Sequence, residues 1–130
     1  MTEEYIATQE YIDEIYEKDA IGRVQMNISV KPEEVPALVR AIKSYFEGLK
    51  ESPVRPEEAH EVDEVFVAGG WAYIVKWREG EVPSIILESG GEDTISSIGI
   101  AAENLMEEIL PVCLGARIDY EELPVGLAID

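Results

Sequence analysis

Three residue types are scarce in this chain, and each scarcity limits its function. There is one cysteine, one histidine, and ten Lys and Arg residues against 28 Asp and Glu. A lone Cys113 excludes an internal disulfide. A nucleophilic triad would have to use His60, and no Gly-x-Ser-x-Gly sequence is present. Cys113 follows a predicted helix rather than preceding one, so we expect a small buried apolar residue, not a reactive thiolate. We therefore assign no catalytic residue and no cofactor, and we favour a non-enzymatic function.

The shortage of basic residues gives the chain a formal net charge of −18. Nucleic-acid binding depends on Lys and Arg replacing counterions on the phosphates, so the charge argues against a nucleic-acid partner. It also argues against anionic membrane surfaces. A basic protein partner or a cationic ligand would be attracted instead.

Long apolar runs are absent too, and none approaches the length that spans a bilayer. The first residues contain no positive region followed by an apolar stretch, so no signal peptide is predicted. We therefore expect a cytoplasmic protein. A length of 130 residues predicts a single domain over 1–130.

Hydrophobic periodicity predicts the elements of this domain. A period near 3.6 indicates an N-terminal helix over 3–18, a second helix opened by Pro32, and a third that begins at Asp93 or Thr94 and ends at Pro111. Residues 51–64 contain two prolines and many acids, which is typical of a loop. Period-two alternation and turn residues place the strands at about 23–30, 64–69, 71–78, 84–88 and 115–120.

This order of elements predicts an α+β fold. Without the first helix and one central strand, the order is βαββαβ, as in ferredoxin-like domains, with two helices on one face of an antiparallel sheet. The core would span 22–120, between the helix at 3–18 and an apolar tail at 121–130. The opposite sheet face would be covered by the N-terminal helix, by the tail or by a partner subunit.

An aromatic row is the main candidate site. Period two places Trp71, Tyr73 and Trp77 on one side of their strand. If that side faces away from the helices, Arg23, Gln25, Asn27 and Ser29 share it, and the surface is a weak candidate for ligand binding or a subunit interface. The alternative is that the aromatics are core residues beneath the helices.

Two other segments are weaker candidates. Glu57 and His60 have a three-residue spacing that occurs in metal sites on helices, but a solvated acidic loop explains their segment better. The glycine-rich turn at 89–94 precedes a helix and could receive an anion, but it lacks the lysine and glycine spacing of phosphate-binding loops. Its acids favour a structural role.

The sequence thus favours a non-catalytic interaction or regulatory domain that self-associates as a homo-oligomer, through the aromatic sheet face or the termini. One alternative is a small-molecule-binding protein or an enzyme with a dispersed site. A second is an acidic mimic of nucleic acid that inhibits a basic partner.

Overall fold

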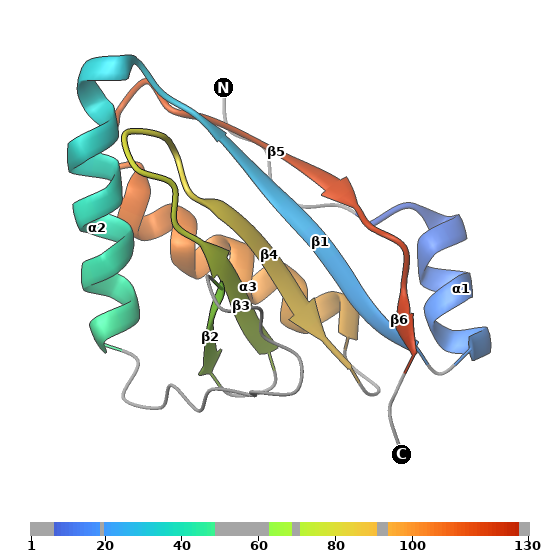
Figure 1. Cartoon of the computed structure of the whole chain (residues 1–130). Helices are drawn as coiled ribbons and strands as arrows, with labels where there is room; N and C mark the ends of the chain where they lie inside the picture. The colour runs from blue at the N-terminus through green and yellow to red at the C-terminus, as the bar shows by residue number, and fades with distance from the viewer. Residues whose placement is uncertain (1–6, 19, 49–62, 69–70, 91–93, 128–130) are drawn as a thin grey trace.

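The computed structural model of the chain combines three α-helices with an antiparallel sheet (Figure 1). It describes residues 7–18, 20–48, 63–68, 71–90 and 94–127. The helices are α1 (Gln9–Lys18), α2 (Val35–Gly48) and α3 (Thr94–Ile109), and a short 3-10 turn, η1 (Pro32–Glu34), precedes α2. The strands are β1 (Ala20–Ser29), β2 (Asp63–Ala68), β3 (Trp71–Lys76), β4 (Ser84–Ser89), β5 (Arg117–Glu122) and β6 (Gly126–Leu127).

Strand β1 is an interior strand of the sheet and pairs with three other strands. The strand order is β2-β3-β4-β1-β5, all neighbours are antiparallel, and β6 pairs with the first residues of β1. Consequently β1 pairs with β4, β5 and β6, which all follow it by more than fifty residues in the sequence. The predicted α+β class with an antiparallel sheet is confirmed.

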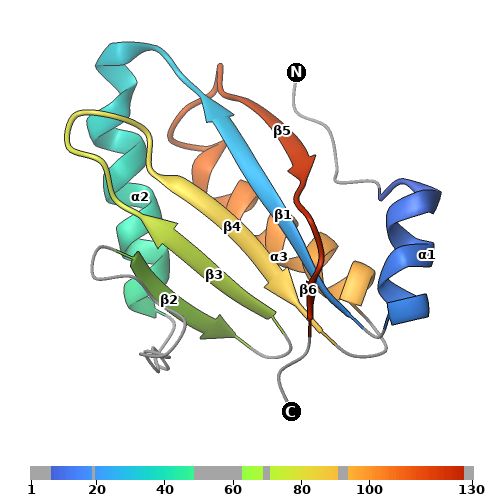
Figure 2. The same ribbon diagram turned by 45° about the vertical axis from the view of Figure 1, so that its right-hand side comes forward.

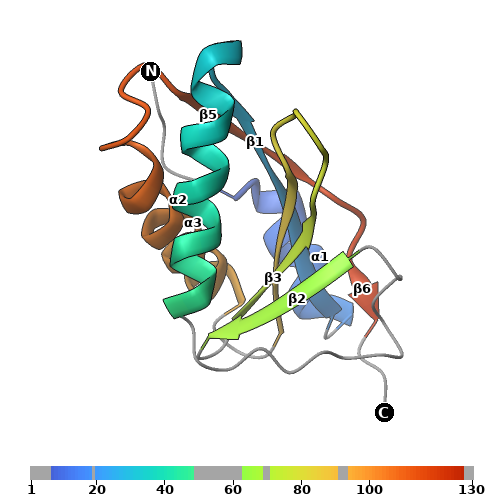
Figure 3. The same ribbon diagram turned by 60° about the vertical axis from the view of Figure 1, so that its left-hand side comes forward.

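Alternation in the sequence determines which face of the sheet becomes the core. In β1 every second residue from Ala20 to Ile28 is buried, and the intervening residues are half-buried. The register aligns Val24 with Leu87 of β4, and Leu87 with Tyr73 of β3, so these three share one face. Helices α2 and α3 pack on that face, as Figures 2 and 3 show. Burying an aliphatic side chain of this size contributes about 1.5–3 kcal/mol, so this shared row is a main source of stability.

Helix α1 lies on this same side of the sheet. A Cβ atom added to Gly22 of β1 would lie 2.7 Å from Thr94 Cγ2, 3.0 Å from Ile98 Cδ1 and 3.1 Å from Ile15 Cδ1. Ile15 belongs to α1, whereas Thr94 and Ile98 belong to α3, so both helices meet β1 where it lacks a side chain. The expectation that the N-terminal helix covers the opposite face is therefore wrong. The apolar tail does not cover it either, because its strand β6 pairs edge to edge with β1.

The hydroxyl of Tyr11 holds α1 to a gap in the sheet edge. Between the pairs Val24–Glu122 and Ile21–Gly126, Arg23 has no strand partner in β5 or β6. The backbone N–H of Arg23 donates to the Tyr11 hydroxyl at 2.8 Å, and Leu123 N–H donates to the Arg23 carbonyl at 2.8 Å. The Tyr11 oxygen is 2.7 Å from the carbonyl oxygens of both Arg23 and Leu123. A hydroxyl has one proton to donate. Because the Arg23 carbonyl already accepts a hydrogen bond from Leu123 N–H, we assign the Tyr11 proton to the Leu123 carbonyl.

No helix within the described ranges combines the length and apolarity needed to cross a bilayer.

Candidate ligand-binding groove

The aromatic row of β3 faces the helices. Tyr73 is fully buried, while Trp71 and Trp77 are half-buried and pack against the core. The Phe46 ring of α2 lies 5.2 Å from the Tyr73 ring and 6.2 Å from the Trp77 ring, measured between centroids. The sequence had left open a core position and an exposed sheet face for this row. The structure places it beneath the helices.

The polar residues grouped with this row lie on the other face of the sheet. Gln25 of β1 is aligned with Ile86 of β4, which is aligned with Ile74 of β3, so these three form a row that alternates with the core row. Arg23 and Asn27 share the face of Gln25 because they are two residues away along the strand. The aromatics and these three polar residues therefore do not form one surface, because the condition for a shared face, a row turned away from the helices, is not met. The register between three strands decides the face, and that register is set by residues far apart in sequence.

The hydroxyl of Tyr73 has a structural role. It donates to the carbonyl of Ala101 in α3 at 2.9 Å and lies 2.9 Å from the hydroxyl of Tyr45 in α2. Since its one proton is used by Ala101, Tyr45 is the donor in the second bond. Burial raises the pKa of Tyr73 above its ordinary value. A neutral Tyr73 therefore links β3 to both helices and is not available as an acid or base.

A groove lies where helix α2 meets the connection between β3 and β4. Its volume is about 750 Å³, which is typical of sites for small organic molecules. Its apolar lining comes mostly from the first half of α2 and its entry, with one aromatic residue from the end of β3: Pro32, Val35, Pro36, Val39 and Trp77.

The charged lining of this groove is predominantly positive. Arg40 and Lys43 come from α2, Arg78 comes from the β3–β4 connection, and Glu79 is the only acid among the residues that line it. None of the three cations forms a salt bridge with a carboxylate of the described residues. Lys43 instead places its Nζ 5.1 Å from the centre of the Trp77 ring, a cation–π contact. Three of the ten basic residues of this acidic chain therefore meet at one groove, without a carboxylate partner among the described residues.

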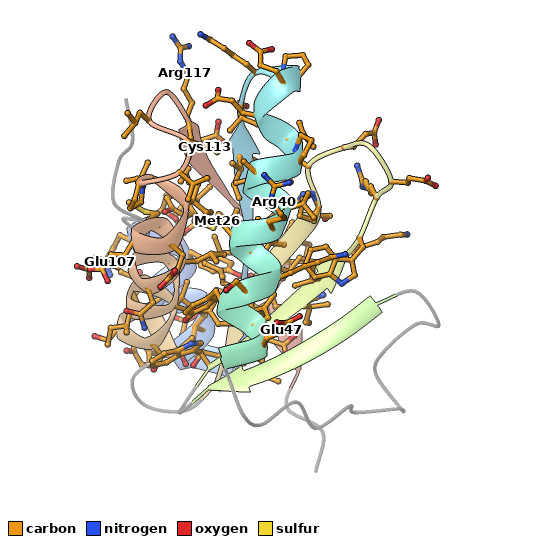
Figure 4. The ribbon with its side chains drawn as sticks, turned by 90° about the vertical axis from the view of Figure 1, so that its left-hand side faces the viewer. Met26, Arg40, Glu47, Glu107, Cys113 and Arg117 are labelled. Carbon is orange, nitrogen blue, oxygen red and sulfur yellow. The ribbon has the colours of Figure 1, made fainter. Side chains whose placement is uncertain are left out.

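Helical spacing and one tight turn bring these residues together. Val39 and Arg40 lie four and three residues before Lys43 on α2, about one helical turn, so both lie close to Lys43 on the helix surface that meets the connection. Figure 4 shows Arg40 on the outer surface of α2, at the height of this connection. Arg78 begins a turn in which Glu81 N–H donates to the Arg78 carbonyl at 3.2 Å, and Gly80 adopts a φ of 74°. That positive φ favours glycine, so Gly80 suits its position in this turn.

The sequence contained only partial signals for this groove. Trp77 is among the candidate binding residues of the sequence, and Arg40 and Lys43 belong to the helix that Pro32 opens. Arg78 is not among the candidates. Val35 and Val39 line the groove and are half-buried. The net charge predicted attraction of cations, but locally the groove is positive.

The remaining candidates give no site in the described residues. Glu57 and His60, and residues 91–93 of the glycine-rich turn, lie outside them. Across the described ranges, no three metal-binding side chains come together. Cys113 is fully buried, and burial, followed by the nearby charge of Glu34, raises its thiol pKa. This environment agrees with the expectation of an unreactive apolar residue.

Comparisons of the chain with protein-family models, with curated proteins and with solved structures find no match.

Proposed function

We propose that this protein is a non-catalytic binding domain that takes up a small organic anion in the groove between α2 and the β3–β4 connection. The observation behind the proposal is the meeting of Arg40, Lys43 and Arg78 at a hollow with an aromatic wall. In a chain of net charge −18, cations without carboxylate partners are not expected to cluster unless the cluster serves a purpose.

The chemistry of the lining supports an organic anion over other ligands. Guanidinium groups donate paired hydrogen bonds to carboxylate or phosphate oxygens. The prolines, valines and Trp77 favour an apolar body next to the anionic group. A nucleic acid remains disfavoured, because its long chain of phosphates would also meet the acidic remainder of the protein. A small anion has to meet only the groove.

This proposal develops the small-molecule alternative from the sequence. It requires no reacting group in the groove. The regulatory role predicted from the sequence fits such a domain, since binding a ligand without converting it is how a sensor works.

Amide chemical shifts of the ¹⁵N-labelled protein test the proposal. Benzoate and benzyl phosphate, titrated to about ten millimolar, are expected to shift amides of residues 32–43 and 77–80, while neutral benzyl alcohol shifts them far less. Arg40→Gln is expected to weaken the response at least fivefold, because it removes one of the three cations. Arg117→Gln is the matched control, since Arg117 is exposed at the start of β5 and does not line the groove. No shift with either anion, or equal shifts with the neutral alcohol, would refute anion binding.

Self-association is a second proposal, supported by a sheet face that no described helix covers. No described helix packs on the face that presents Gln25, Ile74 and Ile86, and both isoleucines are half-buried rather than exposed. A second copy packed there would form a homo-oligomer without the aromatic row. Native mass spectrometry of wild type and Ile86→Asp separates the cases: a dimer that the substitution abolishes supports this interface, and a wild-type monomer refutes it.

We also propose that the fold is a ferredoxin-like variant. The order β5-β1-β4-β3, with α2 and α3 on one face, supports this assignment, and β2 would then be the extra strand at the edge. The acidic-mimic hypothesis and a basic protein partner stay predictions. Both would be tested by pull-down with a cationic protein at low and high salt.

A further inference from the structure

The balance of charge in the groove restricts the proposed anion further. Three cations and one carboxylate line it. An anion with one negative charge would leave the site positive, and an anion with two would neutralise it. A phosphate monoester has a charge of about −1.5 to −2 at pH 7, whereas a single carboxylate has −1. The lining therefore matches a dianion better than a monoanion.

The directions from which the cations approach favour phosphate. Arg40 and Lys43 come from α2 on one wall, and Arg78 comes from the turn on the other wall. A carboxylate has two oxygens in one plane, which suits one guanidinium fork. A phosphate monoester has three terminal oxygens arranged around phosphorus, so it accepts hydrogen bonds from both walls at once.

The apolar lining excludes inorganic phosphate as the full ligand. A water molecule accounts for about 30 Å³ of liquid volume, so an ion the size of a few waters would fill little of a 750 Å³ groove. Val35, Val39 and Trp77 would then stay hydrated. An organic group on the phosphate would cover them and remove apolar surface from water.

We propose that the groove binds a small organic phosphate monoester as its dianion. The phosphate lies between Arg40 and Arg78, within reach of Lys43, and the organic group lies against Val35, Val39 and Trp77. This inference rests on the proposed function of the groove and names the class of its ligand.

Isothermal titration calorimetry with matched small probes tests the inference. Benzyl phosphate is compared with its methyl ester, benzyl methyl phosphate, which keeps the apolar group and the phosphorus but has one negative charge. Benzylmalonate supplies a dianion made of carboxylates, and inorganic phosphate lacks the apolar group. We expect benzyl phosphate to bind about tenfold or more tightly than each of the three.

Variants of the two walls locate the binding. Arg40→Gln and Arg78→Gln are each expected to weaken benzyl phosphate binding about tenfold and to reduce its advantage over the methyl ester. Arg40→Lys keeps the charge but loses the fork, and we expect an intermediate loss. Arg117→Gln, which removes a positive charge elsewhere, is expected to leave the affinity within twofold. Circular dichroism checks that each variant is folded.

The possible failures are distinguishable. If benzoate, benzyl phosphate and benzyl methyl phosphate bind at the groove with equal affinity, the dianion inference is wrong and the proposed function stands. If benzylmalonate binds more tightly than benzyl phosphate, the ligand is a dicarboxylate and the phosphate assignment is wrong. If Arg117→Gln weakens binding as much as Arg40→Gln, only overall charge matters and the groove is not the site. If no anion binds, both proposals fail.

Discussion

The Tyr11 hydroxyl allows a sharp test of how α1 is held to the sheet. The ring of Tyr11 is buried, and its hydroxyl lies between the Arg23 N–H and the Leu123 carbonyl, in place of a direct hydrogen bond between these two groups. Tyr11→Phe keeps the ring and removes only the oxygen. The Arg23 N–H and the Leu123 carbonyl then lose this partner in a partly buried place.

The magnitude follows from those two groups. A buried donor or acceptor left unsatisfied costs about 1–3 kcal/mol. Because water reaches part of this gap, we take the low end for each group and expect a loss of about 2 kcal/mol in the free energy of unfolding. With an unfolding entropy of about 2.1 cal/mol/K per residue over 130 residues, the melting temperature falls by about 7 °C.

Urea unfolding followed by tryptophan fluorescence measures this loss. Tyr16→Phe is the matched control, because Tyr16 lies on the same helix with 55% of its surface exposed. We expect the control to change stability by less than about 0.5 kcal/mol. A Tyr11→Phe variant as stable as Tyr16→Phe would refute the reasoning, since it would mean that water satisfies the gap as well as the hydroxyl does.

Three further predictions concern other parts of the core. Gly22→Ala places a Cβ 2.7 Å from Thr94 Cγ2 and should cost about 1–3 kcal/mol in urea unfolding, whereas Gly126→Ala, whose nearest atom is at 3.5 Å, should be nearly neutral. Because the folded state raises the pKa of Tyr73, the unfolded chain loses the Tyr73 proton first as the pH rises above about 10. The free energy of unfolding should therefore fall by up to about 1.4 kcal/mol per pH unit more in the wild type than in Tyr73→Phe. Parallel pH profiles of the two proteins would contradict this. Cys113 should react with a thiol reagent at pH 8 at least a hundredfold faster in 6 M urea than in the native protein, and equal rates would show that it is accessible.

The sequence predicted local structure well where periodicity was strong. The alternation in 23–30 predicted β1, and Pro32 with its two following glutamates predicted the entry to α2, where Lys31 N–H donates to Glu34 Oε1 at 3.3 Å. The helix at 3–18 starts later in the described chain, at Gln9. Period two correctly grouped Trp71 and Tyr73 on one side of their strand, because that grouping needs only the backbone geometry of one strand.

What the sequence could not predict depends on distant residues. The face occupied by Tyr73 follows from its alignment with Leu87 and then Val24, which joins three separate segments. The groove requires Arg78 of a turn to lie beside Arg40 of a helix, and no local pattern encodes that distance. Composition also misled, because a net charge averages over the whole surface and hides a small region of opposite sign.

The interior position of β1 has a consequence for synthesis of the protein. This strand leaves the ribosome before its partners β4, β5 and β6, and β5 follows about 90 residues after it. At roughly 5–20 residues per second, β1 waits about 4–18 seconds for its β5 pairing. During that interval both edges of an apolar strand lack their final neighbours, and such edges are prone to pair with other chains. A nascent chain of this protein should therefore depend on chaperone protection until its last strands emerge.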